Sequence, residues 1–559
     1  MTSTSRPNQT IRREFSRTTG AIAVTAPGPD VLLQSMQNRA LNAMQDFTGA
    51  LGTLVPALRE ERPAETASRN PLLLPALLLA YVTAMMVFSL CVRCWAPLHT
   101  DMTEMAAWGQ QFQLGYSKHP PLAAWGAGAW FLVMPHTNWS FELFAVLVSA
   151  LGLAGIWATA GLYLDSRGQR LAMLPMILTP ALTTWAFKYN ANSILLALWP
   201  WTTYFFLAML ERSRLRDAVL AGCLAGLAML GKYYSLVLFA TLFVVLLMHP
   251  RRNAVLSSAA PYIAVLVGLV VIAPHVWWVY ETGASTIAYA IEKTHFDIAD
   301  SRATTLRSVA GSLLTLLGPA LFMALAFRDD RAGLTGRLGQ GLRDPARRWF
   351  IVLAWGPLLF TVLAHLATNI RIGGDFLIPA FLMVPLAFLV QLGPPMPARP
   401  AVRLTGGVLA VLLIGAVLSP AIGVAAFLTQ RPPGLEPRAE LAAAVTDIWR
   451  GATKTPLKQV TGVERIATAI TFYSDDHPDY LDGAKTFQFT RDDPRIVRDG
   501  LVFVCASEDA ECLGHAHRTL GEDGVQRYTY TGSHRVFGYA GPMSSFQIFL
   551  VAPRAETAK

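Results

Sequence analysis

Long apolar runs, separated by short polar segments, recur along most of the chain between residues 72 and 428. An α-helix needs about 20 apolar residues to cross the hydrocarbon core of a membrane. The runs predict spans at 72–92, 142–163, 171–187, 193–210, 218–231, 234–248, 259–280, 306–327, 350–367, 375–392 and 404–428. The pattern therefore predicts a polytopic α-helical membrane protein with about 11 transmembrane helices.

The pattern changes on both sides of this region. Residues 1–70 begin with a stretch rich in Thr, Ser, Arg and Pro and continue with a candidate amphipathic helix from Val31 to Leu58. No apolar segment with a small-residue cleavage site precedes Pro71, so we expect a partly disordered or membrane-surface arm rather than a cleaved signal peptide. Residues 431–559 carry charged and turn residues around the short runs Ile466–Tyr473, Leu501–Cys505 and Phe546–Val551, which predict strands of a small α/β domain.

Composition agrees with a membrane protein, and arginine placement predicts its orientation. Hydrophobic residues make up 53% of the chain and charged residues 15%, with a mean hydropathy of +0.39. Short loops rich in Lys and Arg stay on the cytoplasmic side. Such loops contain Arg167 and Arg170; Arg212, Arg214 and Arg216; Arg251 and Arg252; Arg328 to Arg348; and Arg399 and Arg403. We expect a cytoplasmic N-terminus and an outer C-terminal domain, and these loops explain the net charge of +9 without a nucleic-acid partner.

The first outer loop, residues 97–140, holds an unusual number of polar and charged side chains. Asp101 and Glu104 lie one helical turn apart, so both carboxylates can face one cavity. The same spacing also fits a capping box, with Asp101 as N-cap and Glu104 reaching back to its amide. Lys118 and His119 follow, immediately before two prolines. These residue types combine a base for a hydroxyl group with cations for a phosphate.

Several motifs together resemble the GT-C glycosyltransferases. They are Asp101-x-x-Glu104, Trp108-Gly109-Gln110, Lys118-His119-Pro120-Pro121-Leu122-x-x-Trp125, Lys188-Tyr189-Asn190-Ala191-Asn192-Ser193, Gly231-Lys232-Tyr233-Tyr234 and Gly374-Asp375-Phe376-Leu377-x-Pro379. The chain is most similar to bacterial enzymes that use polyprenyl-phosphate sugars, including the aminoarabinose and galacturonic acid transferases of lipid A and core. Protein O-mannosyltransferases are more distant. The resemblance covers most of residues 72–552 and implies a transmembrane catalytic domain over residues 71–430.

The resemblance implies an inverting transfer on the outer face, with Asp101 as the base that activates the acceptor hydroxyl. Glu104 would orient the acceptor or share a metal. Cations would stabilise the departing phosphate, and the candidates are Lys118, His119, Lys232, Lys188 and Arg371. The candidates for binding sugar or acceptor are Asn190, Asn192, Tyr116 and Tyr233.

Each of these residues also has a purely structural interpretation. Lys232 could extend to the membrane interface, and Arg371 could contact solvent or a lipid headgroup. Asn190 and Asn192 could cap a helix. The aminoarabinose transferases place an acidic residue and a lysine before the paired prolines and an aspartate where this chain has asparagine. Because of these differences, the sequence leaves open whether the site binds a divalent metal ion.

Other candidate groups are a metal site and a disulfide. Glu104, His119 and His275 would form the metal site if folding brings them together, although a histidine near a span end is more often packed or hydrogen-bonded. Cys505 and Cys512, seven residues apart in the outer domain, are a candidate disulfide in an oxidising compartment, with two free thiols as the alternative.

The resulting prediction is a multi-pass transferase of a bacterial inner membrane whose active site faces the periplasm. Its partners would be a polyprenyl-phosphate sugar donor, a lipopolysaccharide acceptor in lipid A or core, and membrane lipids. The resemblance alone implies a uronic acid, with galacturonic acid favoured, as the transferred sugar. The alternatives are a protein O-glycosyltransferase and a transporter of lipid-linked sugars, although a transporter would have ionisable residues in the middle of its spans.

Overall fold

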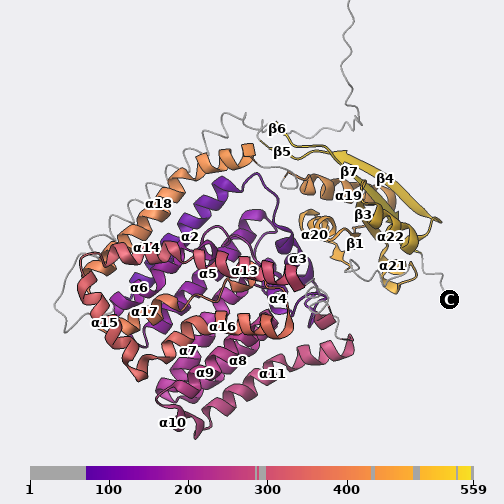
Figure 1. Ribbon diagram of the computed structural model, residues 1–559. Coiled ribbons are helices and arrows are strands. Elements are labelled where there is room, and N and C mark those ends of the chain that lie inside the picture. The colour runs from indigo at the N-terminus through magenta and orange to yellow at the C-terminus, as the bar shows by residue number, and fades with distance from the viewer. Residues whose placement is uncertain are drawn as a thin grey trace, which may run out of the picture. The chain divides into compact units, whose positions relative to one another are not determined.

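The computed structural model describes residues 71–283, 286–288, 298–429, 435–481, 491–536 and 539–554 (Figure 1). The N-terminal arm and its expected amphipathic helix lie outside these residues. The described chain consists of a helical part up to Thr429 and a mixed α/β part from residue 435.

The helical part contains long apolar helices joined by short helices and 3₁₀ turns. Its elements are α2 (Leu73–Val92), α3 (Thr100–Gly109), α4 (Leu122–Phe131), α5 (Asn138–Ala160), α6 (Ser166–Met173), η1 (Leu174–Leu178), η2 (Pro180–Leu182), α7 (Ile194–Arg212), α8 (Leu215–Gly231), η3 (Tyr233–Ser235), α9 (Leu236–Met248), α10 (Arg252–Leu256), α11 (Ala260–Glu281), α13 (Ile298–Leu314), α14 (Leu317–Ala326), α15 (Arg331–Arg343), η4 (Pro345–Arg347), α16 (Trp349–Thr368), η5 (Gly374–Leu377), α17 (Val384–Leu392) and α18 (Ala398–Thr429).

Among the described residues, seven helical segments are long and apolar enough to cross a membrane. They are Leu73–Val92, Asn138–Ala160, Ile194–Arg212, Ala260–Glu281, Asp300–Ala326, Trp349–Thr368 and Ala398–Thr429. The predicted spans at 218–231 and 234–248 correspond to α8 and α9, which have 17 and 13 residues. The polytopic helical fold is confirmed, with fewer full-length helices than the expected 11.

Two predicted spans are not continuous helices. The segment 171–187 consists of the end of α6 followed by η1 and η2, because Pro175 and Pro180 lack the amide hydrogen that a helix interior needs. The segment 375–392 begins as η5 and contains only the nine-residue helix α17. Neither segment is among the described helices that are long and apolar enough to cross a membrane, so apolar composition did not predict their backbone.

The α/β part is built on a five-stranded sheet with the order β2-β1-β3-β7-β4. Its elements are α19 (Arg438–Thr453), β1 (Gln459–Gly462), α20 (Glu464–Tyr473), β2 (Asp479–Tyr480), α21 (Pro494–Asp499), β3 (Leu501–Ala506), α22 (Ala510–Leu520), β4 (Val525–Gly532), β5 (Arg535–Val536), β6 (Tyr539–Ala540) and β7 (Ser544–Val551). β1 pairs in parallel with β2 and β3, whereas β7 pairs antiparallel with β3 and β4. The expected α/β region is therefore present.

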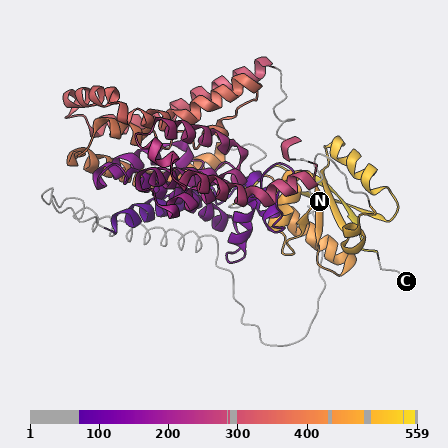
Figure 2. The same ribbon diagram turned by 90° about the horizontal axis from the view of Figure 1, so that it is seen from below.

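Helices cover both faces of this sheet (Figure 2). Successive side chains of a strand point to opposite faces. Val502 and Val504 of β3 pack in one core with α19 and α20, whereas Leu501 and Phe503 pack in another with α22. The predicted strand Ile466–Tyr473 is wrong, because these residues belong to α20, whose Ile466 and Ile470 lie one turn apart on the buried face.

The α/β part shares one hydrophobic core with the loop between α2 and α5. Met102 and Met105 of α3 belong to the same buried cluster as Ile466 of α20. Hydrogen bonds add to this contact: the Tyr473 hydroxyl accepts from the Leu98 amide at 2.9 Å. The helix that carries Asp101 therefore packs directly against the C-terminal part of the chain.

Candidate active site

Asp101 lies in the first turn of α3, and its side chain can interact with residues outside the helix. His99 is the N-cap residue, and its Nδ1 accepts from the Asp101 amide at 3.1 Å. The capping box that the sequence left open is therefore not formed by Asp101 and Glu104. At its other end, Gly109 packs so closely on α4 that a Cβ there would lie 2.5 Å from the Ala124 carbonyl oxygen. This packing fixes the direction of α3.

The Asp101 carboxylate is held by side chains from the segment before α7. Its Oδ2 accepts from Asn190 Nδ2 at 2.8 Å and lies 2.9 Å from Lys188 Nζ. Its Oδ1 lies 3.2 Å from His99 Nδ1. The side chain keeps 34% of its surface exposed, so it is anchored but still accessible.

These contacts determine the charge of Asp101. Burial acts to raise the pKa of Asp101, but its contacts with His99, the charge of Lys188 and the amide of Asn190 together hold it well below its usual range. Because His99 Nδ1 accepts from the Asp101 amide, Lys188 and Asn190 are the groups that donate to the carboxylate. Asp101 is therefore an ionised carboxylate that can accept a proton.

Asn190 presents a fixed amide group to Asp101. Its Oδ1 accepts from the backbone amides of Asn192 and Ser193, at 2.9 and 3.0 Å, in the turn that leads into α7. Because the oxygen is used in that turn, the NH₂ group must face Asp101. The segment is also tied to α4, since the buried Tyr189 hydroxyl donates to the Ala123 carbonyl at 2.9 Å.

Lys232 joins the same segment from the end of α8. It is the C-cap residue of that helix and has an extended backbone, and its Nζ lies 2.5 Å from Asn192 Oδ1. The ammonium group also lies 3.7 Å from the centre of the Phe376 ring. This cation–π contact comes from η5, far along the chain. Asn192 thus connects the Asp101 cluster to Lys232.

Asp375 is a further member of the cluster that sequence reasoning did not select. Its Oδ2 lies 3.9 Å from Lys188 Nζ, so Lys188 lies between the carboxylates of Asp101 and Asp375. The signal was present in the motif Gly374-Asp375-Phe376, where an acidic residue directly precedes an apolar segment. Four segments distant in sequence therefore converge: the start of α3, residues 188–192, the end of α8, and η5.

A second charged cluster connects α3 to the α/β part. Lys118 Nζ lies 2.7 Å from Glu104 Oε1 and also pairs with Glu464 Oε2 at the start of α20. Glu104 is only 5% exposed. Burial and the nearby Glu464 carboxylate raise the pKa of Glu104, against the lowering effect of Lys118. Lys118, predicted to bind phosphate, is held between two carboxylates, and Glu464 was missed because nothing local in the sequence marks it.

Four other candidates lie in aromatic surroundings. The Tyr116 hydroxyl donates to the Trp108 carbonyl at 2.7 Å, and its ring stacks on that of Trp108. The His119 ring meets the edge of Trp108 at a centroid distance of 6.2 Å. The Tyr233 hydroxyl lies 2.6 Å from His275 Nε2. Tyr116 is buried, whereas Tyr233 is half-buried beside the end of α8.

The structure does not assemble the predicted metal site. His275 Nδ1 lies 2.7 Å from the Leu114 carbonyl, and its Nε2 contacts Tyr233, whereas Glu104 is paired with Lys118. In the described ranges, no group of three His, Cys, Asp or Glu side chains is arranged to hold a metal ion. The expectation of a site made by Glu104, His119 and His275 is therefore not supported.

The remaining candidates lie elsewhere. Arg371 precedes η5, and its Nη1 lies 3.4 Å from Asp300 Oδ2 at the start of α13. Cys505 of β3 and Cys512 of α22 form a disulfide with a Cα–Cα distance of 5.7 Å. The disulfide joins a strand to the helix that follows it and lies in the core of the α/β part.

Comparisons with known proteins agree with this architecture. The family model for dolichyl-phosphate-mannose-protein mannosyltransferase matches residues 118–278. The crystal structure of ArnT from Cupriavidus metallidurans bound to undecaprenyl phosphate superimposes with a TM-score of 0.55 at 14% identity, covering 86% of this chain and 98% of that one. The crystal structure of the same ArnT in the apo state superimposes with a TM-score of 0.52 at 14% identity, covering 85% of this chain and 97% of that one. The comparison with curated protein sequences gives no match.

Proposed function

Because the family model and the shared fold support a membrane glycosyltransferase of the GT-C superfamily, we propose that this chain transfers a sugar from a polyprenyl-phosphate donor to lipopolysaccharide, in its lipid A or core. The observation that carries the proposal is the cluster in which an ionised Asp101 is connected, through Lys188, Asn190 and Asn192, to Lys232. This cluster places a proton acceptor and two cations near the ends of apolar helices. Such an arrangement suits a lipid-linked phosphate donor.

In the proposed reaction, an acceptor hydroxyl attacks the anomeric carbon while its proton passes to the Asp101 carboxylate. The bond between the anomeric carbon and the phosphate oxygen breaks on the opposite side, so the configuration is inverted. The polyprenyl phosphate leaves with an added negative charge, which Lys232 and Lys188 would stabilise. Asp101 is a weak base because its pKa is low, but it is fully ionised and aligned by Asn190.

The proposed sugar is a uronic acid, with galacturonic acid favoured by the sequence resemblance. The cations near the cluster support an anionic sugar, but they equally serve the donor phosphate. The proposed location is the periplasmic face of a bacterial inner membrane, in line with the arginine-rich loops at the opposite helix ends.

A protein acceptor is the second candidate, favoured by the description of the matching family model, a protein mannosyltransferase. A transporter of lipid-linked sugar is less well supported, because the charged cluster lies at helix ends rather than along a path through the helices.

The test is mass spectrometry of lipopolysaccharide from a deletion strain complemented with wild type, Asp101→Asn or Asp492→Asn. Asp492 is a matched control because its side chain is 79% exposed and lies in the α/β part. We expect wild type and Asp492→Asn to restore one sugar mass that Asp101→Asn, expressed at equal level, does not. Full restoration by Asp101→Asn would disprove the catalytic assignment. An unchanged lipopolysaccharide mass in the deletion strain would instead favour the protein acceptor, tested next by glycopeptide mass spectrometry.

A further inference from the structure

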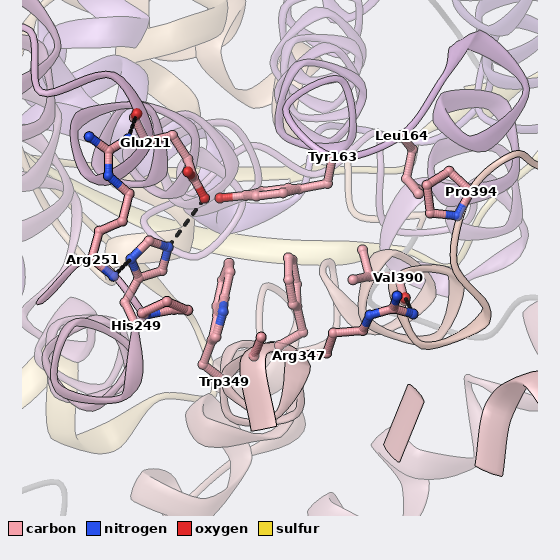
Figure 3. Close-up of a pocket in the computed structure, with 12 residues that line it drawn as sticks. Tyr163, Leu164, Glu211, His249, Arg251, Arg347, Trp349, Val390 and Pro394 are labelled. Carbon is pink, nitrogen blue, oxygen red and sulfur yellow. Dashed lines mark hydrogen bonds and ion pairs between the residues drawn. The ribbon is translucent and has the colours of Figure 1, made fainter. Parts of the chain in front are cut away.

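A cavity of about 280 Å³ lies between side chains of the helical part (Figure 3). Its walls include Tyr163, Glu211, His249, Arg251, Arg347 and Trp349. The Asp101 cluster involves the residues just before α7, whereas Glu211 lies at the other end of that 19-residue helix. Nineteen residues span about 28 Å, close to the thickness of the hydrocarbon core. The two sites therefore lie near opposite ends of α7, at a separation that suits the two faces of a membrane.

The cavity is rich in hydrogen-bond donors. Arg251 donates to the Glu211 carbonyl and to Ser213 Oγ, the latter at 3.3 Å, so both of these acceptors are uncharged. Arg347 donates to the Val390 carbonyl at 3.2 Å and pairs with Asp344. These contacts hold the two guanidinium groups in place at the cavity.

The one carboxylate in the wall already has a partner. Glu211 Oε1 lies 3.2 Å from His249 Nε2, and the Tyr163 hydroxyl points toward the same carboxylate (Figure 3). The loops around the cavity add further positive charge through Arg252 and Arg348. The four arginines 251, 252, 347 and 348 outnumber the carboxylates of Glu211 and Asp344, so the net charge of these residues is positive, which favours an anionic ligand.

The floor and the flanks of the cavity are apolar. The rings of Trp349 and Phe350 stack at 3.6 Å and line the cavity. Next to the lining residues in sequence, Met248 of α9 and Ile351 of α16 are each 37% exposed. Exposed apolar side chains at the ends of apolar helices are suited to contact with lipid tails. A ligand in this cavity can therefore have an anionic head and an apolar tail.

We propose that the cavity binds the phosphate headgroup of an anionic phospholipid from the leaflet opposite the Asp101 cluster, with its acyl chains along α9 and α16. Arg251 and Arg347 would bind the phosphate. Basic pockets between membrane helices on the side of the arginine-rich loops are suited to such headgroups. The cavity is larger than a single phosphate group needs, and its aromatic floor favours a lipid over free phosphate. This proposal does not depend on the proposed sugar transfer.

The first test is native mass spectrometry of the detergent-purified wild-type protein with added phosphatidylglycerol, phosphatidylcholine or inorganic phosphate. We expect retention of phosphatidylglycerol well above that of phosphatidylcholine. Equal retention of the two lipids would overturn the proposal. Binding of inorganic phosphate that prevents lipid retention at millimolar concentration would assign the cavity to free phosphate and likewise overturn it.

The second test locates the lipid with two charge-matched variants. Arg251→Gln/Arg347→Gln removes two charges from the cavity, whereas Arg252→Gln/Arg348→Gln removes the same charge from residues outside its lining. We expect the first variant to bind phosphatidylglycerol about 10- to 100-fold more weakly, and the control, which lowers only the surrounding positive charge, to lose much less binding than the first variant. Arg251→Lys/Arg347→Lys should keep part of the binding and shows that loss is not due to misfolding. Equal loss in both Gln variants would refute the assignment to this cavity.

Discussion

Replacement of Lys118 by methionine tests whether the cluster of Glu104, Lys118 and Glu464 is a buried charge network. Methionine retains the apolar length of the side chain but removes the ammonium that lies 2.7 Å from Glu104 Oε1. Both carboxylates then lose their cation in a site where Glu104 is 5% exposed. Breaking a buried ion pair by removing one partner costs about 3–5 kcal/mol. We expect a destabilisation of that order when both carboxylates are ionised.

The destabilisation caused by Lys118→Met should increase as the pH rises. The pKa of Glu104 is already raised by burial and by Glu464, so the folded protein holds this proton more tightly than the unfolded chain. Its contribution to stability is therefore complete below the ordinary pKa of a glutamate and is lost as the pH rises through the folded-state pKa. Lys118→Met removes the one charge that lowers this pKa. The difference from wild type should grow between about pH 5 and about pH 8.

Thermal unfolding in detergent at these pH values is the assay, and Glu464→Gln is the matched control. The introduced Gln side chain keeps the shape of glutamate, and its amide can donate to Glu104. The cluster then contains one carboxylate, Glu104, and one ammonium group, Lys118. We expect its stability to depend less on pH than that of wild type, the reverse of Lys118→Met. If Lys118→Met lost the same stability at both pH values, or Glu464→Gln left the pH dependence unchanged, the charge-network reasoning would be refuted.

Three further predictions concern single contacts. Lys188→Gln removes the ammonium group that lies 2.9 Å from Asp101 Oδ2, so the pKa of Asp101 should rise. The acidic limb of the pH–rate profile should then move to higher pH, and an unchanged limb would contradict this prediction. Lys232→Met should raise the KM for the polyprenyl-phosphate donor about 10- to 100-fold in assays of purified enzyme, and an unchanged KM would exclude phosphate binding. Cys505→Ser/Cys512→Ser opens a loop of sequence separation 7 and should cost about 2–3 kcal/mol, seen as a lower Tm that dithiothreitol no longer affects.

Hydropathy predicted the long helices well but could not predict where the backbone is interrupted. α2, α5 and α18 lie where long apolar runs stand in the sequence. The segment 171–187 is equally apolar, yet prolines at 175 and 180 turn it into short 3₁₀ segments. Window averages record composition alone, so they do not register a missing amide hydrogen. The wrong prediction of a strand at Ile466–Tyr473 has another cause. Nearly every residue of this short segment is buried, so its apolar residues do not show the spacing that distinguishes a helix from a strand.

The site could be predicted as a set of residue types but not as a set of contacts. Asp101, Lys188, Asn190 and Lys232 were each selected from local motifs, and the structure brings them into one connected cluster. The partners of Lys118 could not be found in this way, because Glu464 lies 346 residues further along the chain. Pairings of this kind depend on packing between α3 and α20, which no local sequence pattern reports.

Asn190 shows why the structural and functional interpretations of one residue need not compete. The sequence left open whether this asparagine caps a helix or binds substrate. In the structure its Oδ1 accepts from the backbone amides of Asn192 and Ser193, in the turn before α7, and this use directs its NH₂ group to Asp101 Oδ2. This turn therefore fixes the orientation of the carboxylate that we propose as the base. Since α7 follows this turn and continues to Glu211, one helix connects the Asp101 cluster to the proposed lipid-binding cavity at its other end.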